Sequence, residues 1–119
     1  MSSTNDIAVV LIDPYNDFLH PDGKLTPRLT ESLNKSNTIH NIKHLLTAAR
    51  SKKIPVYYGL HQQFRMGQYD GWKHMTASHQ GLRNSKVFEE GSWGAEFYEG
   101  LEPDPNNGDV VVSKHWNSR

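Results

Sequence analysis

The feature that most constrains the fold is a short apolar run, IAVVLI at residues 7–12, which ends on the carboxylate of Asp13. The run is too short for a typical helix, is rich in β-branched residues and lacks alternation, so it predicts a strand covered on both faces. A later run, VVVS at residues 110–113, ends on the ammonium group of Lys114. The carboxyl ends of strands border the ligand-binding crevice of an open α/β sheet. Opposite charges at two strand ends therefore indicate a reactive site.

The segment between these runs predicts a helix and a further strand. Residues 36–52 have the period of an amphipathic helix. The apolar residues on its predicted inner face are Ile39, Ile42, Leu45, Leu46 and Ala49. Pro55 then introduces a second apolar run, IPVYYGL, at residues 54–60. A strand, a helix and a strand in this order predict a parallel pair joined by a crossover helix.

The remaining segments read as ordered loops. Turn formers cluster at residues 14–23, and DPNNGD at residues 104–109 is a strong turn that precedes the last strand. Residues 62–100 are rich in glycine and aromatic residues, which favours a folded binding loop. A structureless connection of that length is uncommon in a compact domain, so we expect short helices around 73–83 and 93–100.

Composition limits the class of protein. With 119 residues and a mass of 13.6 kDa, the chain is one domain or part of one. Thirteen basic residues balance thirteen acidic ones, which argues against nucleic acid and anionic membranes as partners. No apolar stretch approaches membrane-spanning length, and we expect a soluble, cytoplasmic protein. The absence of cysteine excludes disulfides, thiolate metal sites and a cysteine nucleophile within these residues.

Four segments resemble the isochorismatase-like, or cysteine hydrolase, family. LIDPYNDFLHPDGKL is similar to its first strand and loop, and IPVYYGLH to its second strand. EEGSWGAEFYEGLEP resembles its helix-bearing segment, and GDVVVSKHWNS its lysine strand. The four segments occur in the family's order and cover nearly the whole chain. Residues 1–119 are therefore identified as an isochorismatase-like domain that is truncated at its C-terminus.

The resemblance implies both a fold and a chemistry. The expected fold is a Rossmann-like, three-layer α/β/α arrangement with a parallel sheet, of whose six strands this chain holds the first three. The family's catalytic Asp and Lys match Asp13 and Lys114. In members that hydrolyse C–N bonds of the amide type, the Asp is the base for a cysteine thiol and the Lys favours the thiolate. The cysteine follows a fourth strand, which lies beyond this chain. Another branch cleaves the vinyl ether of isochorismate with the Asp as acid.

Two functions follow as expectations. The first is a hydrolase of small-molecule substrates in which Asp13 is general acid or base and Lys114 is its electrostatic partner, inactive while the nucleophile-bearing half is absent. The second is a noncatalytic module that associates with a full-length homologue or another copy. Three strands leave an apolar edge unpaired, so we expect a homo-oligomer or another association through that edge.

The remaining candidates are weighed against plainer roles. Asp13 could cap a turn, and Lys114 could be a solvated lysine at a strand end. The predicted substrate pocket comprises Phe18, His61, Trp93 and Trp116, although large aromatic residues are more often core or interface. His61 stands where metal-dependent nicotinamidases carry a ligand cluster, but GLHQQF offers no carboxylate. We therefore predict no metal and no cofactor.

Overall fold

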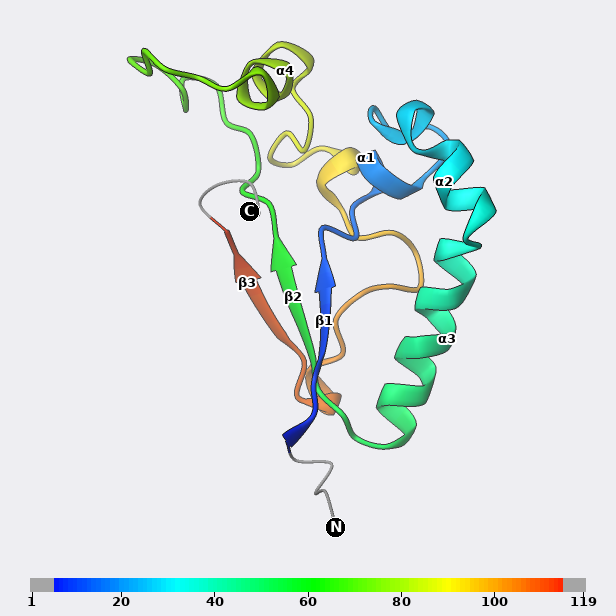
Figure 1. Ribbon diagram of the computed structural model, residues 1–119. Helices are drawn as coiled ribbons and strands as arrows, with labels where there is room; N and C mark the ends of the chain where they lie inside the picture. The colour runs from blue at the N-terminus through cyan, green and yellow to red at the C-terminus, as the bar shows by residue number, and fades with distance from the viewer. Residues whose placement is uncertain (1–5, 115–119) are drawn as a thin grey trace.

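Three parallel strands form the centre of the computed structural model, which describes residues 6–114. They are β1 (Val9–Ile12), β2 (Val56–Leu60) and β3 (Val110–Ser113), with β2 in the middle (Figure 1). All three run in the same direction, so their carboxyl ends share one edge of the sheet. The predicted parallel α/β class is confirmed, and each of the three predicted strands is present.

Helix α3 (Thr38–Ser51) connects β1 to β2 and packs along one face of the sheet (Figure 1). Its inner face buries Leu46 and Ala49, as the periodicity predicts. Leu45 is an exception, because its side chain is 49% exposed. At 100° per residue, Leu45 stands at the margin of the apolar stripe and does not reach the sheet.

Shorter helical segments lie in the connections between the strands. They are α1 (Asn16–Leu19), η2 (Thr26–Arg28), α2 (Thr30–Lys35), α4 (Ala77–Ser85), η3 (Trp93–Ala95) and η4 (Pro105–Asn107). Helix α4 corresponds to the helix predicted near 73–83. It begins after Thr76, whose hydroxyl accepts a hydrogen bond from the His79 amide. The prediction of a helix at 93–100 is wrong. This segment forms only the single 3₁₀ turn η3, because its backbone becomes extended at Glu96.

The hydrophobic core lies on the face of the sheet that α3 covers. It is formed by side chains from this face, from α3 and from the segment between α4 and η4. Tyr15, Tyr58 and Phe88 are its largest buried side chains, each at most 1% exposed. Leu101 closes the core beside Tyr58, whose hydroxyl donates to the Leu101 carbonyl at 2.7 Å. The long middle segment is therefore a folded part of the domain, as its aromatic residues predict.

The face of the sheet opposite α3, here called the bare face, is exposed. Its exposed residues are Val10 (64%), Ile12 (50%), Tyr57 (43%), Val110 (39%) and Val112 (53%). The prediction that the first strand is covered on both faces is wrong for this chain, because no element among residues 6–114 packs over these side chains. Within the same residues, no helix combines the length and apolar character needed to cross a bilayer.

Candidate active site

Asp13 and Lys114 meet at the carboxyl edge of the sheet, although 101 positions separate them in the chain. Lys114 Nζ lies 3.1 Å from both Asp13 carboxylate oxygens, Oδ1 and Oδ2. The two side chains are 16% and 21% exposed, so the pair is partly withdrawn from water. Because the strands are parallel and β2 lies between them, β1 and β3 deliver the two charges to one place. The structure thus brings the two predicted catalytic residues together.

The backbone of Asp13 makes a sharp turn out of β1. Its φ is +50°, a left-handed conformation that costs a residue other than glycine about 1–3 kcal/mol. Its amide still donates to the Gly59 carbonyl at 3.2 Å, and its carbonyl accepts the Tyr15 amide at 2.7 Å. The turn directs the carboxylate across the end of β2 and leads the chain into α1.

His61 contacts Asp13 through its backbone. Its amide donates to Asp13 Oδ1 at 2.6 Å, and its ring is buried beside Phe88 with 5.4 Å between the ring centroids. Ring atom Nδ1 lies 2.7 Å from the Gln62 carbonyl. Donation to a carboxylate is among the stronger hydrogen bonds. His61 is therefore adjacent to the pair, and position 61 contributes a main-chain donor to it.

Tyr15 belongs to the site and was missed by the sequence reasoning. Its hydroxyl donates to the His61 carbonyl at 2.9 Å, and its side chain is 1% exposed. Burial, with the negative charge of Asp13 adding to it, raises the pKa of Tyr15 to about 12. A signal was present, since Tyr15 is the large aromatic residue within the turn-forming stretch after Asp13.

The turn-forming stretch is fixed by two polar side chains from α1. Asp17 is buried, and its carboxylate accepts the amides of Lys24 at 3.1 Å and Phe88 at 2.9 Å. Asn16 donates from Nδ2 to the Trp93 carbonyl at 3.0 Å. These two side chains therefore fix the loop through hydrogen bonds to its backbone.

The predicted pocket residues lie in different surroundings. Phe18 packs on Phe88 with 4.8 Å between ring centroids and lines the same small cavity as Asp13. Trp93 is 44% exposed and stands edge-on to His20, with 4.6 Å between centroids. Trp116 lies outside the described residues. Substrate contact by these side chains stays a prediction.

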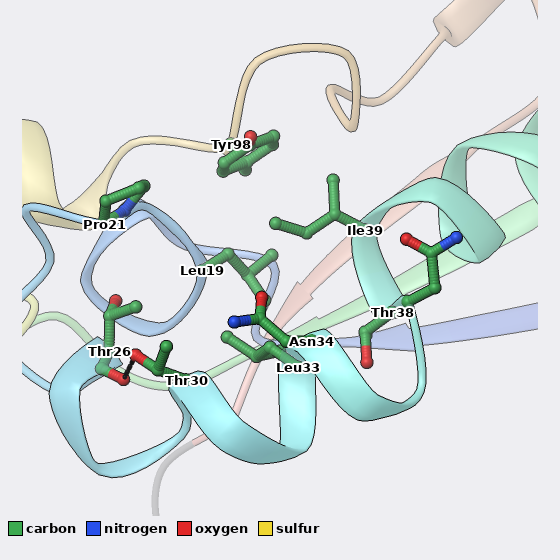
Figure 2. Close-up of a pocket in the computed structure, with 10 residues that line it drawn as sticks. Leu19, Pro21, Thr26, Thr30, Leu33, Asn34, Thr38, Ile39 and Tyr98 are labelled. Atoms are coloured by element: carbon green, nitrogen blue, oxygen red, sulfur yellow. Dashed lines mark hydrogen bonds between the residues drawn. The ribbon is translucent and has the colours of Figure 1, made fainter.

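Three cavities lie near this end of the molecule. One of about 310 Å³ is lined by Tyr15, Leu60, His61, Gln62, Gln63, Arg65 and Ser113. A second, of about 270 Å³, is apolar apart from Asp13 and Thr38 and lies beside the outer edge of β1. A third, of about 450 Å³, lies between α2, α3 and Tyr98, and no charged side chain lines it (Figure 2). The first is polar and adjoins the Asp13–Lys114 pair, so it is the best candidate for substrate.

Metal-binding geometry is not found in the described part of the chain. Among residues 6–114, no three side chains of His, Cys, Asp or Glu are grouped so that they could hold an ion. His40 and His44 lie one turn apart on α3, with their rings stacked 6.4 Å apart. The carboxylate and the ammonium of the Asp13–Lys114 pair are charged groups that this site offers for chemistry, and Arg65 lines the cavity beside them.

The fold and the site define an open, parallel α/β protein with a carboxylate–ammonium ion pair at its strand ends. Comparison with known families gives the particular group: the isochorismatase domain model matches residues 7–118, and the chain belongs to this family. A comparison with curated proteins found no match.

Solved structures agree with this fold. An isochorismatase from Pseudomonas putida KT2440 is 22% identical, with a TM-score of 0.55, over 95% of this chain and 44% of its own. N-carbamoylsarcosine amidase from Thermoplasma acidophilum is also 22% identical, with a TM-score of 0.56, over 91% and 51%. A cysteine hydrolase from Pseudomonas syringae pv. phaseolicola 1448A is 23% identical, with a TM-score of 0.58, over 95% and 48%. The chain thus spans about half the length of these structures.

Proposed function

We propose that this chain supplies the acid–base half of an isochorismatase-like hydrolase site. The observation that carries the proposal is the contact of Lys114 Nζ with both oxygens of Asp13 at 3.1 Å. Asp13 is the general acid or base, and the ammonium group of Lys114 stabilises negative charge that develops beside it. Membership of the isochorismatase domain family supports this assignment.

The bond class follows from what such a pair can do. For a C–N bond of the amide type, Asp13 takes the proton of a thiol and the thiolate attacks the carbonyl carbon. The C–N bond breaks as the nitrogen receives that proton from Asp13, and water then hydrolyses the thioester and restores the thiol. The 119 residues contain no cysteine, so the thiol must come from outside them, and we expect residues 1–119 alone to be inactive on such bonds. For a vinyl ether, Asp13 is instead the acid that protonates the substrate, and no thiol is needed.

The test is hydrolysis by the purified protein in its natural length. The probes are N-carbamoylsarcosine for C–N cleavage and isochorismate for vinyl-ether cleavage. We expect turnover of one of them, lowered roughly 100-fold or more by Asp13→Asn, and lowered also by Lys114→Met. Glu31→Gln is the control, because Glu31 is exposed in the first turn of α2 and lines neither of the two cavities beside Asp13. Turnover that Asp13→Asn leaves intact, or no turnover of either probe, would overturn the proposal.

A second candidate function is association, and the bare sheet face favours it. The amides of Val9 and Asp13 donate to the carbonyls of Pro55, directly before β2, and Gly59 in β2, at 3.1 and 3.2 Å. Alternation along β1 therefore directs the backbone groups of Val10 and Ile12 to its outer edge. The side chains of these two residues are also on the bare face. An open strand edge beside uncharged apolar surface is a template for another chain. A second copy or a full-length homologue is the partner we propose.

The association is tested by sedimentation of residues 1–119. We expect a species heavier than the 13.6 kDa monomer, which Val10→Lys converts to monomer. Leu45→Lys is the matched control, because Leu45 is similarly exposed, at 49%, but belongs to α3 and not to the bare face. A monomeric wild-type chain, or an equal response to both substitutions, would rule out this surface.

A further inference from the structure

The backbone of His61 is held between two side chains that come from the end of β1. Its amide donates to Asp13 Oδ1 at 2.6 Å, and its carbonyl accepts the Tyr15 hydroxyl at 2.9 Å. Both contacts use main-chain atoms of one residue. A movement that releases the carbonyl would therefore also move the amide away from the carboxylate.

Tyr15 is suited to hold this carbonyl. Its ring packs on Phe88 and Phe97, with centroid distances of 5.0 and 6.4 Å, and only 1% of the residue is exposed. Its backbone is also fixed, because it forms a β-bridge with Phe97. Burial raises the pKa of Tyr15 to about 12, so the phenol is protonated and remains a donor near neutral pH.

Asp13 depends on external support for its orientation. Its φ of +50° is unfavourable for a residue with a side chain, and such conformations persist only where the surroundings fix them. Its carboxylate accepts the His61 amide and contacts Lys114 Nζ. Lys114 has a long flexible side chain, whereas an amide at the end of a strand is rigid. The amide is therefore the contact that can define the direction of the carboxylate.

We propose that Tyr15 is a positioning residue: through the backbone of His61 it sets the orientation in which the Asp13 carboxylate presents both oxygens to Lys114. The consequence for catalysis rests on the proposed function of Asp13, but the positioning itself does not. The plainer role for Tyr15 is that of a core aromatic residue whose hydroxyl only satisfies a buried carbonyl. The two roles differ in whether the loss of the hydroxyl reaches the Asp13 carboxylate.

The experiment is NMR of the His61 amide in the wild-type chain and in Tyr15→Phe, which keeps the ring and removes the hydroxyl. Asp13→Asn should displace the amide proton shift of His61, because it removes the charge that the amide contacts, and the size of this displacement is the response measured. We expect Tyr15→Phe to reduce the amplitude of the response to less than about half. It should also speed exchange of this amide roughly fivefold, the effect of about one hydrogen bond.

Tyr58→Phe is the matched control. Tyr58 is fully buried, and its hydroxyl likewise donates to a backbone carbonyl, that of Leu101, at 2.7 Å. This variant should lose stability and leave the His61 amide response unchanged. If Tyr15→Phe does not fold, an α-hydroxy analogue of Gln62 weakens the His61 carbonyl as an acceptor while Tyr15 is kept, and the same loss of amplitude is expected.

The outcomes separate this inference from the proposed function. An unchanged amplitude in Tyr15→Phe, or an equal reduction in Tyr58→Phe, would overturn the positioning role. The measurement needs no substrate, so it can succeed even if neither probe is hydrolysed. If hydrolysis is found, Tyr15→Phe should lower kcat more than it changes KM, because the reacting carboxylate is misdirected while the ring at position 15 still lines the cavity.

Discussion

Asp109 is the residue whose replacement should test the packing of this domain most severely. Its side chain is fully buried directly before β3. One carboxylate oxygen accepts the Val56 amide at 3.0 Å and Asn107 Nδ2 at 2.9 Å. The other accepts the Asp104 amide at 2.9 Å and Arg50 Nη2 at 3.1 Å. A single side chain thus joins α3, the start of β2, the η4 loop and β3.

Asp109→Asn keeps the shape and replaces one acceptor oxygen by a donor. If the remaining oxygen keeps Val56 and Asn107, the new amide group faces the Asp104 amide and Arg50. The loss of a bond to a charged partner costs about 1.5–3 kcal/mol, and a buried donor without an acceptor costs about 1–3 kcal/mol. Arg50 is 25% exposed, so water can replace part of its contact. We therefore expect a loss of about 3 kcal/mol, a large share of the stability of a small domain.

The assay is urea unfolding followed by circular dichroism, with Glu90→Gln as the control. Glu90 pairs with Arg65 at 2.7 Å, but the two side chains are 50% and 67% exposed. Exposed pairs contribute about 0–1 kcal/mol, so this control should change the midpoint little. If Asp109→Asn costs no more than Glu90→Gln, the reasoning that burial and multiple donors make this carboxylate structurally important is refuted.

The same carboxylate predicts a dependence on pH. Burial alone would raise the pKa of Asp109, but donors from Asp104, Asn107, Val56 and Arg50 hold it below the ordinary value of 3.8. A folded-state pKa below the unfolded one gives stability that is present above the unfolded value and is lost as pH falls through the folded one. The difference between wild type and Asp109→Asn should thus be full at about pH 7 and shrink below about pH 4. A constant difference in urea unfolding at both pH values would contradict this.

Three further outcomes are expected. Gly94→Ala would place a methyl group against the buried Asp17 carboxylate and should cost about 2 kcal/mol in urea unfolding, whereas Gly81→Ala, in open space on α4, should stabilise by up to about 1 kcal/mol. Lys24→Met removes an ammonium group that contacts the last carbonyls of α4 at 2.9 and 3.1 Å, and should cost about 0.5 kcal/mol by the same measure. Tyr15 should ionise in ultraviolet titration only near its raised pKa of about 12, and since its folded pKa exceeds the ordinary 10.0, the stability it contributes should be lost as pH rises through that range. Ionisation of all tyrosines near the ordinary value would contradict this last point.

Local patterns predicted the elements better than their surroundings. The amphipathic period located α3, yet Leu45, at the margin of its apolar stripe, is exposed. The number of helix positions that become buried depends on the shape of the surface on which the helix packs, and the period does not give that shape. The segment 93–100 has helix-compatible residues but forms only the turn η3. The Asn16 amide donates to the Glu96 carbonyl and Tyr15 forms a bridge with Phe97, and these contacts fix the following backbone in an extended form. An apolar run identifies a strand, and the number of its faces that are covered depends on elements elsewhere.

Local patterns were enough to predict the parallel α/β class, the three strands, and the placement of Asp13 and Lys114 at strand ends, because these properties follow from local periodicity and from the direction of parallel strands. The packing of the whole domain was needed to show that β2 lies between β1 and β3, that Lys114 reaches both oxygens of Asp13, and that the His61 backbone contacts both Asp13 and Tyr15. These contacts join residues 46 to 101 positions apart. Their geometry depends on packing across the sheet, which no local pattern encodes.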